Sequence, residues 1–388
     1  MELNGKIYYI TRTWADITTG NSCAILRVIY ADMLRHLAPV VVVTPLYTGQ
    51  ELCTEGFVSF SYDKKSIRKD LYLEYLGLKE DYLESWVKKT FQFLKDIVNE
   101  NDVVYATTGG ELGCIKLGSM LKKKCNCKFV VHFRDPVDGD ILYGKKTVGY
   151  RGFSREKTID KYLENADGFI AFSDSYAEYL RMSTRGEGKQ IFAHYTGYAE
   201  SIQIPNKTDN RDYLNVVYAG TNTKVQNSKI LYRAFRGNEK VKVTYICKEY
   251  KKMKKEMPEN NIQCIPLMAH DKFLEYMIKE ADIGFVSLLG KNVQDFIPSK
   301  IYEYINLGLP ILASLPIEGS ASKIIKDGNY GVVCDINNVD ELQNAIKQFQ
   351  NKENYDGFRN SILRDKDKWY YLTREEQFES NMVKLLKG

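Results

Sequence analysis

The sequence of 388 residues lacks the long apolar segments that place a protein in a membrane or direct it out of the cell. No apolar run reaches the roughly 18 to 20 residues that a membrane-spanning helix needs. Residues 1–10 lack the basic start and the apolar core of a signal peptide. We therefore expect a cytoplasmic protein.

The sequence also lacks the paired C-x-x-C spacing of a zinc site. Its eight cysteines are scattered, and Cys125 with Cys127 forms a C-x-C. We interpret all eight as reduced thiols. The spacing D-x-D at Asp138–Asp140, which can bind a divalent metal ion, recurs at Asp365–Asp367, so the pattern arises easily by chance. We predict no metal ion and no cofactor.

Charge of one sign is not concentrated in either half of the chain. Residues 1–200 carry 27 basic and 26 acidic side chains, and residues 201–388 carry 28 and 24, which together give the formal net charge of +5. This balance opposes a nucleic-acid-binding module. Basic clusters at 122–124, 145–146 and 251–255 are typical of solvated helix faces. The alternative, peripheral contact with anionic lipid at the inner face of the cell membrane, stays open.

What the sequence does contain is a regular alternation of short apolar runs with segments of helical periodicity. Such alternation predicts parallel sheets flanked by helices. The segment 82–98 keeps its apolar residues on one side of a helix and leads directly into a strand. The predicted strands are residues 6–10, 40–44, 102–106, 128–133, 168–172, 214–219, 241–247, 282–288 and 310–313.

The length and a polar run at 202–215 predict two Rossmann-like α/β domains. We assign the first domain to residues 1–205 and the second to 212–365. An amphipathic segment at 366–388 follows no strand, so we expect a helix that crosses back to the first domain. Ligands of such sheets bind at the carboxyl ends of the strands, which predicts a cleft that both sheets face.

The most informative stretch is Pro298–Ser314. It predicts a short helix that starts near a proline, ends at a glycine and is followed by a strand. The amino end of that helix, with Ser299 and Lys300 beside it, suits a diphosphate. The two carboxylate oxygens of Glu303 could accept hydrogen bonds from the vicinal hydroxyls of a ribose.

This stretch resembles the donor-site signature of the family 4 retaining glycosyltransferases, which have the GT-B fold and are also described as glycosyl transferases group 1. The resemblance implies a nucleotide-sugar site formed by Pro298, Ser299 and Lys300, with Glu303 on the nucleotide ribose. Asp295 stands eight residues earlier, where the family usually has Glu, and its contact with the donor sugar is therefore an open question.

A second match is the run 130–136, V-V-H-F-R-D-P, followed by A-D-G-F-I-A-F-S at 166–173. Bacterial members of the family have a similar F-R-D-P motif at this place. The resemblance implies that His132 lies near the donor sugar and the acceptor hydroxyl. It also implies that Arg134 and Asp135 shape the acceptor side. A lone histidine at the end of a strand is more often structural, and we favour the functional interpretation because the histidine lies inside the motif.

Two loops complete the predicted donor site. Gly20 opens a helix after the first strand and permits close approach of the backbone to a phosphate. The family usually has two glycines here, whereas this chain has Gly20 and Asn21, and no G-x-G-x-x-G for nicotinamide is present. After residue 219, the resemblance implies a basic residue that neutralises the diphosphate, either Lys224 or Lys229.

The resemblance implies a metal-independent, retaining hexosyltransferase that moves a sugar from a nucleotide sugar to a glycan or lipid-linked acceptor. Its setting would be bacterial surface polysaccharide biosynthesis, and the leaving phosphate would itself take the acceptor's proton. Two alternatives stay open. One is a nucleotide-sugar 2-epimerase of the same architecture, and the other is a non-catalytic, nucleotide-binding protein.

Overall fold

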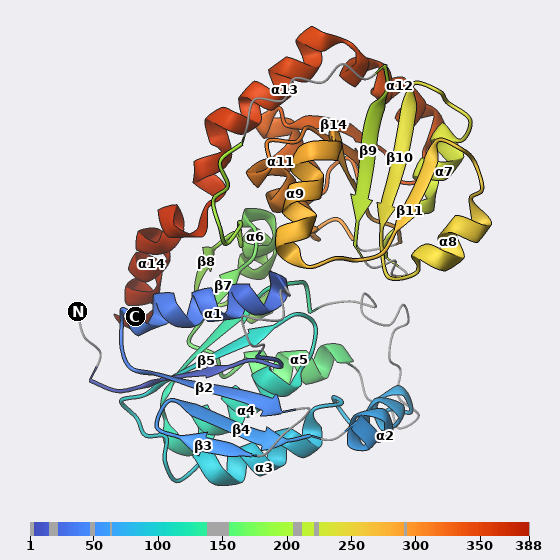
Figure 1. Cartoon of the computed structure of the whole chain (residues 1–388). Helices are drawn as coiled ribbons and strands as arrows, with labels where there is room; N and C mark the ends of the chain where they lie inside the picture. Colours follow the sequence, from blue (N-terminus) through green and yellow to red (C-terminus); the bar gives the residue numbers. More distant parts are fainter. Residues whose placement is uncertain are drawn as a thin grey trace. The chain divides into compact units, whose positions relative to one another are not determined.

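The computed structural model describes residues 4–14, 22–46, 51–62, 64–137, 155–204, 212–220, 225–290 and 293–387. The chain forms two compact units (Figure 1). The first unit contains Met1–Thr196 together with Arg374–Gly388, and the second contains Gly197–Thr373. The predicted site residues Gly20, Asn21 and Lys224 lie outside the described residues, as do Asp138–Asp140 and residues 205–211 of the polar run at 202–215.

The first unit contains an eight-stranded sheet in the order β3-β4-β2-β1-β5-β6-β7-β8, as far as the chain is described. All neighbouring strands are parallel except the pair β3 and β4. The strands are β1 (Ile7–Ile10), β2 (Val40–Leu46), β3 (Leu52–Thr54), β4 (Phe57–Ser61), β5 (Val103–Thr108), β6 (Lys128–Phe133), β7 (Gly168–Ala171) and β8 (Gln190–Ala193). The helices are α1 (Ser22–Arg35), α2 (Lys64–Tyr75), α3 (Glu84–Leu94), α4 (Gly113–Cys125), α5 (Arg155–Leu163), α6 (Asp174–Met182) and α14 (Glu375–Lys387).

Helices cover both faces of this sheet, with α1 and α14 on one face and α3 and α4 on the other (Figure 1). Successive side chains along β6 point alternately to the two faces of the sheet. Phe129 faces α4, where a Cβ at Gly118 would lie 2.2 Å from its ring. His132 points to the opposite face and meets Tyr30 of α1. The strand is therefore buried on both sides, as expected in a parallel sheet.

The second unit contains a parallel six-stranded sheet in the order β11-β10-β9-β12-β13-β14 within the described residues. The strands are β9 (Leu214–Ala219), β10 (Val241–Ile246), β11 (Ile262–Ile265), β12 (Ile283–Ser287), β13 (Ile311–Ser314) and β14 (Gly331–Cys334). The helices are α7 (Lys229–Phe235), α8 (Tyr250–Glu256), α9 (His270–Glu280), α10 (Lys300–Asn306), α11 (Ser320–Gly328), α12 (Val339–Gln350) and α13 (Lys352–Asp365).

All nine predicted strands are present, and the predicted helix at 82–98 is α3. A C-terminal helix was expected over residues 366–388, and the structure corrects the position at which it begins. Residues 366–369 and 371–374 form two 3-10 turns, and α14 begins only at Glu375. The first of these turns carries Trp369, which is buried against Tyr302 of α10, so this segment belongs to the second unit. No helix in the described part of the chain has both the length and the apolar character needed to cross a bilayer.

The position of α10 depends on a glycine in the neighbouring strand β12. A Cβ at Gly284 would lie 2.4 Å from the ring of Tyr304, so only glycine lets that ring lie against the strand. The buried hydroxyl of Tyr304 donates to the backbone oxygens of Val217 and Phe285, at 3.4 and 3.3 Å. The sequence-predicted glycine stop is Gly308, whose φ of +65° lies in the left-handed region.

We predict that Gly284→Ala lowers the stability of the second unit by about 1–3 kcal/mol, the usual cost of overpacking a core. Thermal unfolding of the purified variant measures this change. The matched control is Gly357→Ala in α13, where nothing lies within 4 Å of an added Cβ. The control should unfold at the wild-type temperature or slightly above it. Equal unfolding temperatures for both variants would contradict the packing assigned to Tyr304.

Candidate functional site

In the first unit, polar residues gather where three neighbouring strands end. β1, β5 and β6 are adjacent in the sheet, so the segments that follow them meet at one edge. The Glu111 side chain, which is 0% exposed, lies between two guanidinium groups at this edge. Its carboxylate is 3.5 Å from Nη1 of Arg12 and 3.4 Å from Nη2 of Arg134.

The loop after β5 holds this carboxylate in place. The hydroxyl of Thr108 donates to the backbone oxygen of Glu111 at 2.6 Å and accepts from the Gly110 amide at 3.1 Å. The Gly109 amide donates to Oε2 of Glu111 at 3.0 Å. A turn of this kind fixes both the backbone and the side chain of the glutamate before any ligand arrives.

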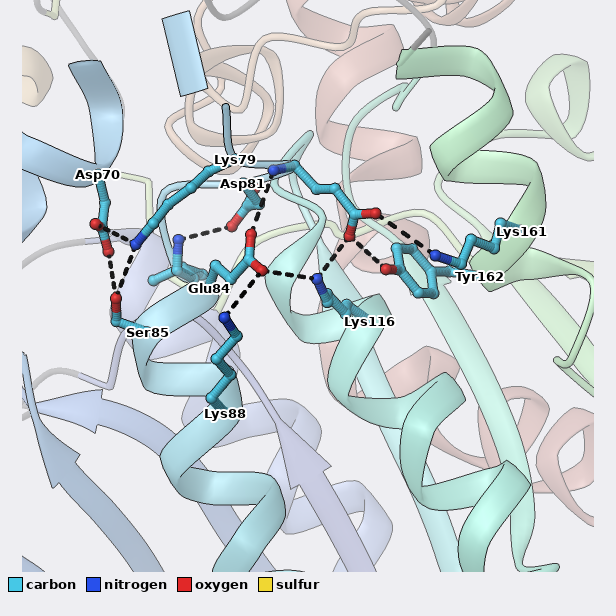
Figure 2. A network of polar contacts seen from close by, with 11 residues as sticks. Asp70, Lys79, Asp81, Glu84, Ser85, Lys88, Lys116, Lys161 and Tyr162 are labelled. Carbon is cyan, nitrogen blue, oxygen red and sulfur yellow. Dashed lines mark hydrogen bonds and ion pairs between the residues drawn. The ribbon is translucent and has the colours of Figure 1, made fainter. Parts of the chain in front are cut away.

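A network of acidic and basic side chains supports the same loop from the side of α3, α4 and α5 (Figure 2). Asp81 accepts hydrogen bonds from the amides of Leu83 and Leu112, at 2.9 and 2.8 Å. Leu112 directly follows Glu111, so Asp81 connects the start of α3 to the glutamate loop. Burial is the largest cause that raises the pKa of Asp81. Around it, Lys116 of α4 pairs with Glu80 at 2.6 Å.

Asp135 and Arg134 lie next to Glu111, and one polar atom of Arg134 is unsatisfied. Burial raises the pKa of Asp135 from 3.8 to about 6, although the positive charge of Arg134 opposes the rise. Nε of Arg134 is buried and has no hydrogen-bond partner in the described residues. A Cβ at Gly109 would lie 3.1 Å from Oδ2 of Asp135, so the loop approaches this carboxyl closely. A donor and an acceptor side by side suit a hydroxyl group, which can both accept and donate.

His132 lies in an aromatic cluster on the face of the sheet that α1 and α14 cover, and it is 1% exposed. Its Nδ1 is 2.8 Å from the hydroxyl of Tyr105, and its ring meets Tyr30 edge to face at 4.7 Å. Phe378 of α14 packs on both tyrosines. Burial holds the pKa of His132 well below 6.5, with a further contribution from His194. The imidazole is therefore neutral at physiological pH.

In the second unit, Glu303 is at the centre of a second polar cluster. Its side chain is 15% exposed, pairs with the ammonium of Lys300 on the same helix, and lies 3.8 Å from Nδ1 of His270 at the start of α9. The ring of Phe273 stacks near His270 and lies 4.5 Å below the Lys300 ammonium. One carboxylate, one ammonium, an imidazole and an aromatic face therefore meet at the junction of α9 and α10.

The other described donor-site residues predicted in this unit lie before α10, at its start, or on α7. Pro298 is half-buried and Ser299 is the exposed N-cap residue, whose side chain makes no capping hydrogen bond. Asp295 is half-buried in the turn that precedes the helix. Lys229 is the first residue of α7 and pairs with Glu256 of α8 at 2.7 Å, with its side chain 56% exposed.

Sequence reasoning missed four residues that complete these clusters, namely Arg12, Tyr105, Glu111 and His270. A signal existed for Glu111, because T-T-G-G-E directly follows an apolar strand, the position at which α/β sheets hold ligands. The contact between His270 and Glu303 joins residues 33 positions apart and becomes visible only when α9 and α10 are placed together.

Comparison with known proteins gives a family match for part of the chain and a fold for the whole of it. Residues 200–362 match the family model described as glycosyl transferases group 1. No curated protein matches the chain. An α,α-trehalose 6-phosphate synthase from Burkholderia multivorans is 10% identical, with a TM-score of 0.68 and coverage of 100% of this chain and 98% of that one. The lipopolysaccharide outer core galactosyltransferase WaaB is 14% identical, with a TM-score of 0.64 and coverage of 98% and 99%.

A structure from E. coli described as trehalose-6-phosphate bound with UDP-2-fluoro glucose is 10% identical. Its TM-score is 0.68, and the match covers 97% of this chain and 98% of that chain. At these identities the likeness establishes the fold, which is GT-B. The sequence-based prediction of two Rossmann-like domains of this fold is confirmed, whereas the cleft between them stays a prediction.

Proposed function

Because residues 200–362 belong to the glycosyl transferases group 1 family and the chain has the GT-B fold, we propose that this protein is a retaining, metal-independent glycosyltransferase. It would move a sugar from a nucleotide sugar to a glycan or lipid-linked acceptor. The observation that carries the proposal is the cluster around Glu303, in which a mostly enclosed carboxylate lies beside a fixed ammonium within the family-matched region.

On the donor side, we assign the ribose hydroxyls to Glu303 and the diphosphate to Lys300, with Pro298 and Ser299 beside it. A carboxylate accepts hydrogen bonds from two vicinal hydroxyls, and an ammonium is a compact partner for phosphate oxygens. The ion pair between the two side chains supports this assignment, because it holds both groups in position before the nucleotide binds.

Four further residues remain proposed donor ligands on the family resemblance. Gly20 and Asn21 would approach the donor through their backbone, and Lys224 or Lys229 would neutralise the diphosphate. Lys229 would first have to release Glu256. Both lysines stay candidates for this role.

On the acceptor side, we assign the incoming hydroxyl to Asp135 and Arg134. The orphan Nε of Arg134 and the enclosed carboxyl of Asp135 offer the donor and the acceptor that a sugar hydroxyl needs. Glu111 would be a positioning residue, because it holds the guanidinium of Arg134 by charge and hydrogen bonding, and Arg12 would help to position Glu111 by pairing with the same carboxylate.

Two more residues were predicted to act near the transferred sugar, His132 and Asp295. His132 would act as a neutral hydrogen-bond partner, because burial lowers its pKa, and Tyr105 leaves Nε2 as the ring nitrogen for a substrate. Asp295 would reach the donor sugar from the turn before α10. Retention follows if the leaving phosphate takes the acceptor's proton on the face from which it departs, so no protein nucleophile is needed.

The proposed setting is bacterial surface polysaccharide biosynthesis in the cytoplasm, with peripheral contact at the inner face of the cell membrane. A GT-B neighbour described as a lipopolysaccharide outer core galactosyltransferase supports this setting. The basic clusters at 122–124 and 251–255 would supply the lipid contact, which should weaken as salt rises.

The test is an activity assay with a panel of nucleotide sugars, with and without a lipid-linked glycan fraction from bacterial membranes. The proposal expects acceptor-dependent release of a nucleoside diphosphate, and NMR of the product should show an unchanged anomeric configuration. A changed sugar nucleotide without acceptor would identify the 2-epimerase alternative. Nucleotide binding without any turnover would identify the non-catalytic alternative.

The raised pKa of Asp135 predicts a pH dependence of the transfer reaction. Burial raises the pKa of its carboxyl from the ordinary value of 3.8 to about 6 in the folded protein. Below pH 6 the carboxyl is therefore mostly protonated and no longer accepts the hydrogen bond of the acceptor hydroxyl. We expect kcat/KM for the acceptor to fall about tenfold per pH unit below 6. Initial rates between pH 5 and 8 measure this limb.

Asp135→Asn should lower the rate above pH 7 and remove the acidic limb. Glu100→Gln, which neutralises an exposed carboxylate of the same unit, is the control. The control should keep the limb. A limb near pH 6 that survives in Asp135→Asn would refute the assignment.

A further inference from the structure

A histidine and two glutamates converge in the first unit, outside the candidate donor and acceptor sites. His36 directly follows α1, and Glu375 and Glu379 are one turn apart on α14. Nδ1 of His36 lies 2.8 Å from Oε1 of Glu379 and 3.2 Å from Oε1 of Glu375. The three ligand atoms all lie within 4.8 Å of one another.

Negative charge around this imidazole exceeds what one imidazolium can neutralise. The hydrogen bond to Glu379 is the largest cause of a raised pKa of His36, and the charges of Glu375, Glu379 and Asp32 add to it. Asp32 has its own partner in Arg35. Two carboxylates of α14 therefore share a single histidine, an arrangement that a divalent cation would neutralise fully.

The two contacts of His36 are close to the spacing of ligand atoms in a metal coordination shell. A tetrahedral zinc ion with ligand distances of about 2.0–2.1 Å places its ligand atoms about 3.3 Å apart. The contacts of 2.8 and 3.2 Å need only small side-chain shifts to reach that spacing. One imidazole with two carboxylates suits zinc, whereas calcium and magnesium prefer oxygen ligands alone.

We propose that His36, Glu375 and Glu379 bind one zinc ion, with water in the fourth position. The side chains are 56%, 20% and 29% exposed, so an ion can enter from solvent. The chain returns to the first unit between Thr373 and Arg374, and Glu375 is the first residue of α14. The ion would therefore fasten the start of the returning helix to the end of α1. This is a structural role that does not depend on the proposed transfer reaction.

The test is isothermal titration calorimetry of zinc into untagged, chelator-treated full-length protein at pH 7.5. Wild type should bind one equivalent, and zinc should raise its unfolding temperature. His36→Ala and Glu379→Gln should each weaken binding at least tenfold. Glu376→Gln is the matched control, because Glu376 is an exposed carboxylate of the same helix that is not part of the cluster, and it should bind zinc like wild type.

Cobalt(II) gives a second readout, since a visible absorption band reports an ordered site with nitrogen and oxygen ligands. Affinity should fall with falling pH, because protons compete with the metal for His36 and for the facing carboxylates of Glu375, Glu379 and Asp32. Unfolding temperatures without metal show that each variant is folded. Failure of wild type to bind zinc, or equal binding by His36→Ala, would overturn the proposal and leave the contacts as an ion pair only.

Discussion

Glu111→Ala is expected to lower the free energy of unfolding of the first unit by about 3 kcal/mol, the lower end of the range for breaking a buried ion pair. The Glu111 side chain is fully buried between Arg12 and Arg134, and alanine leaves both guanidinium groups without their shared counter-charge. The Gly109 amide loses its acceptor as well. We take the lower end because the Arg12 side chain is 32% exposed and is partly solvated.

Urea unfolding followed by tryptophan fluorescence measures this loss, since Trp86 is buried in the first unit. Glu111→Gln should cost less, because its amide oxygen can still accept from Gly109. Glu100→Ala, an exposed glutamate of the same unit, is the control and should change the stability by less than about 0.5 kcal/mol. If Glu111→Ala behaved like Glu100→Ala, Glu111 could not be the residue that organises the edge of the sheet.

Glu303→Ala should reduce kcat/KM for the nucleotide sugar by about a hundredfold. Hydrogen bonds to a charged group contribute about 1.5–3 kcal/mol each, and we assign two of them to this carboxylate. A loss of about 3 kcal/mol corresponds to about two factors of ten. Lys300 also loses the partner that holds its ammonium in place.

Steady-state release of nucleoside diphosphate measures the effect, with Glu353→Ala as the control. Glu353 is an exposed glutamate in the first turn of α13, and its removal should leave kcat/KM unchanged. The unfolding temperature of Glu303→Ala should stay close to that of wild type, because the side chain is not fully enclosed. Wild-type kinetics for Glu303→Ala would show that the nucleotide binds elsewhere.

The positions of the central strands along the chain could be predicted, because buried strands are rich in apolar residues. Residues 128–133 and 214–219 are mostly apolar, and the strands that they form, β6 and β9, have the predicted bounds. Predictions failed at the edges of the sheets. β3, β8, β11 and β14 are short and partly exposed, so their sequences carry no long apolar run, and the prediction missed them. It also missed β4, which pairs with β3.

The candidate sites show the same division between local and long-range information. The helix of Glu303 could be predicted because proline, glycine and strand signals all fall within seventeen residues. The contact of that glutamate with His270 could not be predicted, because His270 comes from another helix. The burial of His132 was also hidden, since it depends on Tyr30 and Phe378, from α1 and α14.

The measurement that tests the central claim most directly is a thermal-shift screen of the wild-type protein and Glu303→Ala against a panel of nucleoside diphosphates and nucleotide sugars. A ligand at about 100 times its Kd stabilises the folded protein by about 2.7 kcal/mol, which such a screen detects readily. The account predicts that nucleotides of one base stabilise wild type and that Glu303→Ala loses the shift. Absence of a shift with every nucleotide, or an equal shift in the variant, would contradict a donor site at Glu303.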